Sequence, residues 1–443
     1  MMSPRQVPRT LRLLLASPLL ALSFCAAVHA QSLNEVYEMA RAYDATYQAA
    51  RAQAEAAEYR AAQAEGLGLP FVNANGNAVA SQIDLPKGAS GDNNALQTRI
   101  TGRYPLFNRA NNATIEQARR SLVASRAELE SAEQDLVIRV AQAYFDVLAA
   151  QDTVQLTRVS KTAILEQLAS AKRNFEVGTA TITDTREAQA AADLATAQEI
   201  AADIDLRNRR IVLGTLVGRR DIVPYTLASP VVLPTVMPNN VEEWVNIADT
   251  VHPQVIRAQV ALEVASLEIN KAKAGLLPTV DAVASVGVNY ASGDSIIPGS
   301  TRIGTIGVEL NWPLYTGGSV QNRIKETVSL EQRSRDELDN ARRSVAQSTR
   351  VAFFTVQSGE ALVKALEAAE SSAKLSLDAT QLGYKVGVRV NIDVLNAQTR
   401  LFQTQRDLFK SRYDVLVGSL RLRQVSGQLT PGDMNAVNSL LAR

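Results

Sequence analysis

The chain has 443 residues, with 46 Lys and Arg against 45 Asp and Glu, two histidines and one cysteine. Balanced charge argues against nucleic acid as a partner, and the scarcity of His and Cys argues against a zinc site or histidine-based catalysis. Aromatic residues make up only 5% of the chain while alanine is plentiful, which favours long helices in close contact over a thick globular core.

The first thirty residues have the features of an export signal. Three arginines come before or at the start of an apolar run from Leu13 to Ala27, and Val28-His29-Ala30 ends in a small residue suited to cleavage before Gln31. The run is too short for a membrane-spanning helix, and no later stretch supplies about twenty consecutive apolar residues. We therefore expect an exported chain with residues 1–30 as its signal peptide and no membrane helix after them.

Cys25 allows an alternative in which the processed chain carries a lipid on this cysteine. Phe24 argues against that alternative, because a small residue is expected before a lipidated cysteine. If Cys25 instead leaves with the signal, the remaining chain has no disulfide, no thiolate nucleophile and no cysteine metal site. Its Lys and Arg then fall to 43 against 45 acids, a net charge of −2.

Two halves of the sequence align on each other, which predicts an internal two-fold repeat. Leu69-Pro70 recurs as Leu277-Pro278, 208 residues later, and the offset becomes 209 further along. The other matching pairs are Pro105-Leu106-Phe107 with Pro313-Leu314-Tyr315, Ala143-Tyr144-Phe145 with Ala352-Phe353-Phe354, Asp184 with Asp393, and Gln189 with Gln398. The alignment divides the chain into a first repeat, 31–220, a stiff proline-rich linker, 221–241, a second repeat, 242–428, and a tail, 429–443, which we expect to be loose.

Long helices are predicted in both repeats. No proline occurs from 106 to 223 or from 314 to 430, and these stretches are rich in good helix formers, with apolar residues at intervals of three, four and seven. In the first repeat we expect one helix from about Asn112 to Glu176, ~100 Å long, flanked by helices at about 34–64 and 185–217 of half that length. Helices this long need lateral neighbours to bury their apolar faces, so the pattern predicts a helical tube or bundle.

Each repeat also contains two segments with the alternation of a β-strand. In Val280–Tyr290 and Thr305–Trp312 the even positions are apolar and the odd ones mostly small or polar, and Val72–Ala80 and Thr98–Tyr104 follow this pattern more weakly. Each segment is close to the length of a tilted strand that crosses a bilayer. Tyr104, Tyr290 and Trp312 lie near segment ends, where an aromatic girdle is expected. The loops 81–97 and 291–301 are predicted as exposed hairpin tips.

A soluble sheet that covers a core with one face alternates in the same way. The export signal and the long helices without a sheet-sized core favour the membrane interpretation. Four strands cannot close a barrel, and open edges are not tolerated in lipid. Because about eight strands form the smallest closed barrel, several chains must pool their strands. The predicted fold class is a mixed α/β membrane protein with four β-strands per chain.

These features together resemble the TolC family of outer-membrane efflux proteins, over essentially the whole mature sequence. The resemblance rests on the two Leu-Pro strand entries, the strand exits Tyr104–Phe107 and Trp312–Gly318, and the helix-turn segments Val177–Asp184 and Val386–Leu395. Singly these motifs are weak, but they occur twice in the same order. Departures at Asn108-Arg109, Asp44-Ala45 and His252-Pro253 affect local turns, and His252 is expected at a helix entry.

The resemblance implies a homotrimer in the outer membrane, whose twelve-stranded β-barrel is continued by a long α-helical, coiled-coil barrel across the periplasm. It implies the exit duct of a tripartite efflux pump or type I secretion system, with no enzymatic activity and no cofactor. The implied partners are a periplasmic adaptor (membrane fusion) protein, an inner-membrane pump or ABC exporter, and outer-membrane lipid. The cargo stays open between drugs, metals and proteins.

Two other classes of protein compete with this interpretation. A secreted or periplasmic coiled-coil structural protein without a channel would explain the helices, but not two repeats with four lipid-pattern strands. A periplasmic enzyme or binding module is disfavoured because the mature sequence has one histidine, His252, no cysteine and no compact domain. Chemistry by carboxylates alone stays open, although no acidic pair stands out from the helical background.

The resemblance also implies a gate at the turns that join the two helices of each pair, here Gly178–Asp184 and Gly387–Asp393. Three chains would bring three copies each of Asp184 and Asp393 toward one axis, where crowded carboxylates attract cations. The competing explanation is that each aspartate simply caps the helix that follows it, and Asp184 has capping-box spacing with Glu187.

Polar links between these turns would hold a closed tip, and the matching positions are Thr183, Asp184, Tyr384 and Arg389. We expect Arg389 to bond a neighbouring Thr183 and Tyr384 to bond Asp184, each exposed link contributing roughly 0–1 kcal/mol. The alternative for Tyr384 and Arg389 is an ordinary solvated helix end. Gly178 and Gly387 are predicted as left-handed helix C-caps rather than moving hinges.

Overall fold

The computed structural model describes residues 30–85, 89–228, 231, 233, 235–293 and 299–442. The predicted signal peptide up to residue 29, with Cys25, lies outside the described residues, and so do residues 86–88 and 294–298 of the two predicted hairpin loops, 81–97 and 291–301.

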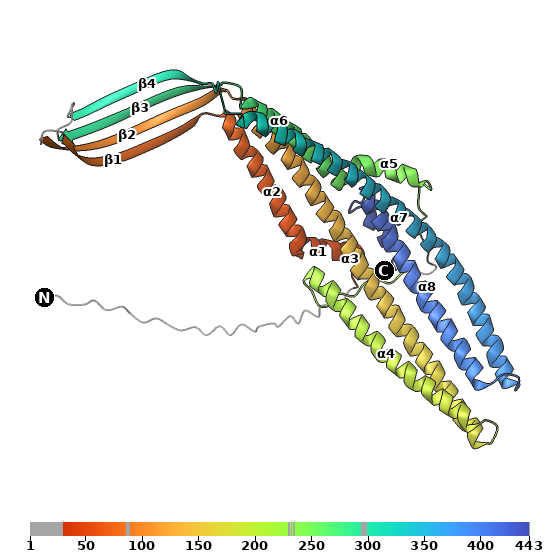
Figure 1. Ribbon diagram of the computed structural model, residues 1–443. Helices are drawn as coiled ribbons and strands as arrows, with labels where there is room; N and C mark the ends of the chain where they lie inside the picture. Colours follow the sequence, from red (N-terminus) through yellow and green to blue (C-terminus); the bar gives the residue numbers. More distant parts are fainter. Residues whose placement is uncertain are drawn as a thin grey trace, which may run out of the picture.

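The described elements come in one order twice, and Figure 1 shows them as a sheet at one end of a long set of helices. The first set is α1 (Leu33–Tyr43), α2 (Ala45–Glu65), the 3-10 turn η1 (Gly66–Gly68), β1 (Phe71–Leu85), β2 (Ala89–Phe107), α3 (Arg109–Glu176) and α4 (Ile182–Val217). The second set is α5 (Val241–Val251), α6 (Pro253–Ala274), β3 (Thr279–Gly293), β4 (Gly299–Asn311), α7 (Ser319–Lys385) and α8 (Asn391–Val425), and α9 (Asp433–Asn438) follows.

Corresponding helices of the two sets have nearly equal lengths: 11 and 11 residues, 21 and 22, 68 and 67, and 36 and 35. The predicted helix from about Asn112 to Glu176 is confirmed as α3, which is ~100 Å long. Its start is fixed by Asn108, whose side chain accepts from the N–H groups of Ala110 and Asn111. The mixed α/β fold with four strands and very long helices is therefore confirmed.

The helix predicted over 34–64 is broken into α1 and α2 by a single residue, Asp44. Its carboxylate accepts from the backbone N–H of Tyr47 at 2.8 Å and takes two hydrogen bonds from the guanidinium of Arg139 on α3. His252 takes the equivalent place between α5 and α6, where its Nδ1 accepts from the N–H of Gln254 and Pro253 opens the helix. The expected helix entry at His252 is confirmed.

The four strands form one antiparallel sheet in the order β1-β2-β3-β4, with β1 and β4 at its edges. Ladder pairing covers residues 81–85, 89–97, 291–293 and 299–301, so the prediction of long loops at 81–97 and 291–301 is wrong. The strands continue because backbone pairing does not need apolar alternation, and polar residues such as Gln82 and Asn94 extend both strands of the first hairpin.

One face of the sheet is apolar and exposed. The even-numbered residues of β3 and β4 lie on it: Ile306 is 90% exposed, and Val286, Val308 and Leu310 are 58% to 67% exposed. The face of odd-numbered residues is mostly polar, with Asn, Gln, Thr, Ser and charged side chains, and it is interrupted by single apolar residues such as Val79, Val283 and Ile303. The predicted alternation is therefore confirmed as two chemically different faces.

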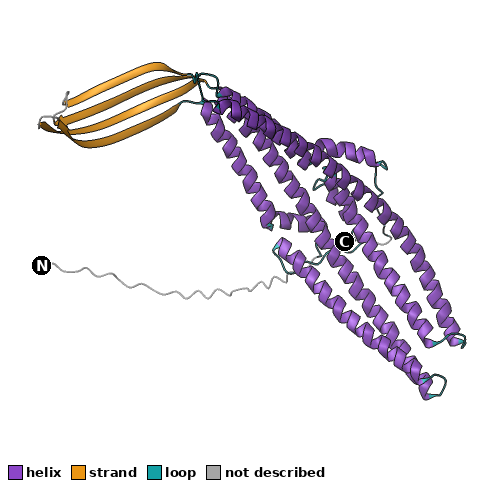
Figure 2. Ribbon diagram, viewed as in Figure 1, coloured by secondary structure: helices purple, strands orange, loops and turns teal. Residues whose placement is uncertain are grey.

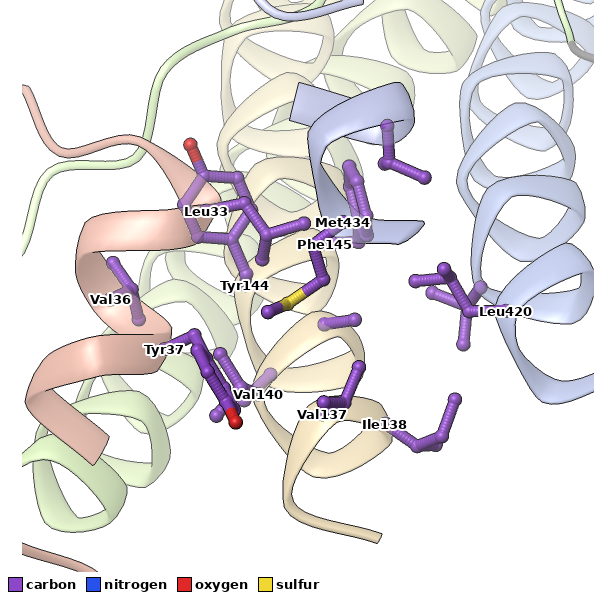
Figure 3. Close-up of a cluster of buried hydrophobic side chains, with 14 of the residues drawn as sticks. Leu33, Val36, Tyr37, Val137, Ile138, Val140, Tyr144, Phe145, Leu420 and Met434 are labelled. Carbon is purple, nitrogen blue, oxygen red and sulfur yellow. The ribbon is translucent and has the colours of Figure 1, made fainter. Parts of the chain in front are cut away.

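The largest buried cluster lies halfway along the helices, where α1, α3, α8 and α9 meet (Figure 3). Tyr144 and Phe145 of α3 pack there edge to face, beside Leu420 and Met434. The Tyr144 hydroxyl donates to the Gln31 carbonyl at 2.9 Å and accepts from the Tyr225 N–H at 2.8 Å. Gln31, near the start of the described residues, and Tyr225 in the linker between the two sets are thus both fixed to the middle of α3.

The tail also belongs to this cluster, so the expectation of a loose segment after 428 is wrong for the described residues up to 442. Met434, Val437 and Leu441 are buried, and the Ala442 N–H donates to the Thr226 carbonyl at 2.7 Å. The helix α9 has only six residues, too few for its apolar spacing to be recognised in the sequence. None of the described helices has an apolar stretch long enough to cross a membrane.

Candidate functional site at the helix tips

The two turns that join α3 to α4 and α7 to α8 lie at the same end of the molecule, opposite the sheet (Figures 1 and 2). Both turns have the same backbone geometry. The N–H of Gly178 donates to the Phe175 carbonyl at 3.0 Å and that of Thr179 to the Asn174 carbonyl at 2.8 Å. Gly387 and Val388 repeat these two bonds at the end of α7.

This pair of bonds is the Schellman motif, which needs a left-handed residue directly after the helix. Gly178 has a φ of 81° and Gly387 a φ of 79°. The prediction that both glycines are left-handed helix caps is therefore confirmed.

The two aspartates start the returning helices. The carboxylate of Asp184 accepts from the backbone N–H of Thr181 at 2.9 Å and from its hydroxyl at 2.7 Å, and the Thr181 hydroxyl accepts in turn from the Asp184 N–H. Asp184 is thus the third helical residue of a capping box whose N-cap is Thr181, so the alternative in which Asp184 is itself the N-cap, at capping-box spacing from Glu187, is wrong.

Asp393 occupies the same position in α8, but the N-cap there is Val390, which has no side-chain acceptor. The Asp393 carboxylate accepts only weakly from the Val390 N–H, at 3.3 Å, and lies 3.7 Å from the guanidinium of Arg389. Asp393 is therefore less constrained by capping than Asp184, and its charge is partly offset by an exposed arginine.

The structure places the remaining predicted residues at the tips but joins them differently within one chain. The Tyr384 hydroxyl accepts from the Asn174 side-chain amide at 3.1 Å, not from Asp184. The Arg389 side chain folds over Gly383 and reaches Asp393. Thr183 is the second residue of α4 and is exposed. The expected bonds of Arg389 to Thr183 and of Tyr384 to Asp184 are not formed within the chain.

A buried polar residue that the sequence did not single out connects the two tips. Asn391, the first residue of α8, is only 2% exposed. Its side-chain oxygen accepts from the Gln167 amide of α3, and its amide donates to the Asp184 carbonyl at 3.3 Å. With the Asn174–Tyr384 bond, this contact joins the α3–α4 pair to the α7–α8 pair. In the sequence, Asn391 could be recognised only as an amide residue at the start of a helix, and an exposed helix cap has the same appearance.

Small residues let the tip helices approach closely. Ala171 of α3 and Ala188 of α4 are fully buried, and Leu395 of α8 packs into the same cluster. Val394 faces a second cluster with Leu377 of α7. The tip is therefore a packed bundle of four helix ends on which the turns are held. Among the described residues, no group of three or more His, Cys, Asp or Glu side chains is arranged to hold a metal ion.

The chain has a four-stranded sheet with an exposed apolar face. The sheet is continued by two helices of ~100 Å, and each of them ends in a turn to a shorter helix. These features define a subunit of an outer-membrane channel. The sequence matches the model of the outer membrane efflux protein family over residues 36–219 and 244–428. The chain belongs to this family. It is accordingly an outer-membrane protein with its helical part in the periplasm, and a channel subunit rather than an enzyme.

Individual relatives agree over nearly the full length. The chain is 29% identical over 418 residues to the outer membrane protein TolC of Vibrio cholerae, covering 93% of this chain and 94% of that protein. It is also 29% identical to the alkaline protease secretion protein AprF of Pseudomonas aeruginosa, covering 92% and 87%. The resemblance to the TolC family is thereby confirmed.

Solved structures of similar fold include the outer membrane protein VceC of Vibrio cholerae, with a TM-score of 0.77 and 20% identity over 89% of this chain and 96% of that one. The MtrE outer membrane channel of Neisseria gonorrhoeae, solved in its open state, has a TM-score of 0.74 and 20% identity over 90% of each chain. At this identity the likeness concerns the fold.

Proposed function

We propose that three copies of this chain form the exit duct of an efflux pump or type I secretion system, gated at the periplasmic helix tips. The observation that carries this proposal is the open sheet. Its edge strands β1 and β4 leave backbone groups unpaired, and its apolar face is exposed. Neither feature is stable in lipid unless the sheet joins others into a closed barrel. Three sheets of four strands give a barrel of twelve.

The twofold order of the elements supports a continuous helical barrel below the sheet. Each set contributes one long helix paired with two shorter ones, and each helix pair ends in the same kind of turn. We interpret this as an internal repeat, so that three chains supply six similar units around one axis. Such a barrel reaches ~100 Å from the membrane, far enough to meet a periplasmic adaptor protein and the inner-membrane pump or ABC exporter it serves.

The gate in this proposal is the ring of turns. Three copies of Asp184 and Asp393 lie around the axis, so a narrow tip favours cations. Tyr384, Arg389 and Thr183 are the polar contacts of the tip, within a chain or between neighbours. Exposed links of this kind contribute about 0–1 kcal/mol each, which an adaptor's binding energy readily exceeds.

Mass and conductance of the purified protein test the duct. We expect a trimeric mass in detergent, and a small, cation-preferring conductance in planar bilayers from a closed acidic tip. A monomer without conductance would instead indicate a coiled-coil structural protein with no channel. A trimer that conducts well without preferring cations would retain the duct and reject the acidic gate.

A further inference from the structure

The polar face of the sheet carries few charges, and they are unevenly placed. Among the described odd-numbered strand residues, the charged side chains are Arg99, Arg103, Asp281 and Glu309. Arg103 donates to Asp281 at 3.0 Å and to Glu309 at 2.9 Å, so it joins β2, β3 and β4 near the helices. Both acidic side chains of this face therefore form ion pairs with the same arginine, Arg103.

Arg99 is different, because none of the described residues forms an ion pair or hydrogen bond with its side chain. It lies in β2, where its ladder partners are Asn75 on β1 and Gly287 at the middle of β3. A side chain at position 287 would crowd it, because a Cβ added there lies 3.4 Å from the Arg99 Cβ and 2.9 Å from the Thr98 carbonyl oxygen. The surroundings leave the guanidinium exposed on a polar face, without a counter-charge.

The acids near Arg103 are too distant to neutralise Arg99. Gly287 and Asp281 are six residues apart on β3, which is ~20 Å at 3.3 Å per residue. At 0.1 M salt the Debye length is about 10 Å, so charges this far apart are largely screened from each other. Neutral amide and hydroxyl side chains, such as Asn73, Gln97 and Thr101, lie on the same face around it.

Closure of the barrel brings three such cations together. Twelve strands spaced ~4.8 Å apart and tilted by ~40° give a circumference of ~75 Å and a radius of ~12 Å. The apolar face of the sheet must face lipid, so the face of Arg99 lines the lumen. Because side chains extend inward from this wall, each guanidinium lies within about one Debye length of the axis, and the three fields overlap there.

We infer that Arg99 forms a ring of three arginines in the barrel lumen that binds multivalent anions, such as polyphosphates. This inference rests on the proposed trimer. It gives the duct two charged rings of opposite sign, a basic one in the barrel and an acidic one at the tips. Anionic solutes are then held near the outer exit, while the tips select against them.

Calorimetric titration of tripolyphosphate into the purified trimer at about 0.1 M salt, where the acids near Arg103 are screened from Arg99, tests the ring. We expect one tripolyphosphate per three chains, with a dissociation constant that rises at least about tenfold in Arg99→Gln and recovers in Arg99→Lys. Arg302→Gln is the matched control, since Arg302 forms no ion pair among the described residues but pairs with Val288 on the apolar face. Its affinity should equal that of the wild type.

The possible failures are distinguishable. A conducting trimer whose tripolyphosphate affinity does not change in Arg99→Gln would overturn the ring and leave the duct intact. Three independent sites per trimer, or an equal loss in Arg302→Gln, would also reject a single central site. A wild-type chain that forms no trimer would overturn both the duct and the ring.

Discussion

Asp184 and Asp393 are the third residues of two equivalent helices, α4 and α8. Each carboxylate accepts a hydrogen bond from the backbone N–H of the N-cap residue and also places a negative charge at the tip. These two roles can be separated by an isosteric amide, because Asn retains the acceptor oxygen that Thr181 and Val390 use. We expect the double substitution Asp184→Asn with Asp393→Asn to weaken block of the channel by spermine by about tenfold or more, ~1.4 kcal/mol. Trimer assembly should not change.

The matched control is Asp336→Asn, which removes an exposed aspartate of α7 far from the tips. Single-channel recording with spermine on the tip side measures both variants. Block that is equal in the double variant and the wild type would show that the aspartates serve only as caps.

Asn391 gives a second prediction at the scale of one residue. Asn391→Ala removes the acceptor of the half-buried Gln167 amide and the donor to the Asp184 carbonyl, at a cost of about 1 kcal/mol for each hydrogen bond. Because the lost contacts join the two helix pairs, we expect the tips to separate more often and the resting conductance to rise. The control is Asn396→Ala, an amide five residues later on the exposed side of α8. A conductance no higher than that of the control would exclude a locking role for Asn391.

For the tip residues, the sequence predicted where each residue lies better than it predicted the hydrogen-bond partner of each side chain. Every predicted tip residue lies at a tip, because the glycine motifs fix where the helices end. The partners were missed, because a polar side chain near a turn has several acceptors within reach and tertiary packing chooses among them. Tyr384 bonds Asn174 rather than Asp184 for this reason. Asn391 was missed because its importance comes from the burial of its side chain, and the presence of an asparagine in the sequence does not show whether that side chain is buried.

At the scale of the elements, the two Schellman turns end helices of 68 and 67 residues, and both depend on a left-handed glycine. A Cβ at Gly178 or Gly387 meets no atom within 4 Å, so alanine there adds only backbone strain, about 1–2 kcal/mol per site. We expect Gly178→Ala to accelerate hydrogen exchange of the amides in the turn roughly five- to thirtyfold.

Gly66→Ala is the control, because Gly66 also has open space but a φ of −58° that alanine adopts freely. Exchange measured by mass spectrometry on peptides covering 174–181 should not change in this control. A turn that exchanges equally in both variants would mean that the motif does not hold the tip.

Two aspartates of the helical part, the buried Asp44 and the half-buried Asp152, are expected to respond to pH with opposite signs. Burial raises the pKa of Asp152, which accepts from the Tyr413 hydroxyl between α3 and α8. The hydrogen bonds from Arg139 lower the pKa of Asp44. Asp152 therefore favours folding below its ordinary pKa, and this contribution is lost as pH rises through the raised value. Asp44 contributes above its ordinary pKa, and its contribution is lost as pH falls through the lowered value.

Thermal unfolding from about pH 2 to pH 7 tests this pair. Asp152→Asn should raise the melting temperature at pH 7, with a gain that shrinks toward pH 4. Asp44→Asn should lower it at pH 7, with a loss that shrinks on strong acidification. Shifts of the same sign and pH dependence in both variants would contradict the assignment.

The sequence predicted the type of nearly every long element and failed at short or polar ones. Proline-free stretches and seven-residue spacing located α3 and α7, because summed propensity over many turns is a strong signal. The break at Asp44 and the six residues of α9 were missed, because one cap or one turn carries little periodic information. The strand extensions beyond Ala80 were missed because alternation reports a half-buried face, and in these extensions polar residues such as Gln82 and Asn94 interrupt the apolar positions.

At the scale of the whole molecule, the helices α4 and α7 are the outer members of the helical layer. The helix α4 packs on α3, α3 on α8, and α8 on α7, and Figure 1 shows α4 and α7 on opposite sides. Both carry apolar side chains that are left exposed by the described residues. Ile204 and Ile211 of α4 are 52% and 65% exposed, and Phe354 of α7 is 51% exposed beside a groove of about 780 Å³ between α7 and α8.

These two surfaces lie at one height along the bundle. Arg209 of α4 pairs with Asp146 of α3, the neighbouring Phe145 ring lies 5.7 Å from that of Tyr413 on α8, and two residues further Val415 lines the groove. A head-to-tail ring can therefore place α4 of one copy in the α7–α8 groove of the next, with the heights matched. The groove is lined by Gly359 and Gly418, where a Cβ would meet Val415 and Val356 of the same chain, so these glycines let α7 and α8 approach each other closely.

This arrangement predicts that two opposite charges, one on each facing surface, restore a trimer that a single charge disrupts. A folding defect would not be reversed in this way. Ile211→Asp and Phe354→Asp should each shift the purified protein from trimer toward monomer, because each buries an unpaired carboxylate between copies. Ile211→Asp combined with Phe354→Lys should recover trimer, since the aspartate of one copy then meets the lysine of the next. Mass measured in detergent reports the ratio of trimer to monomer. Full trimer in both single variants would place the contact between copies elsewhere, whereas monomer in all three variants would show that the two residues do not face each other.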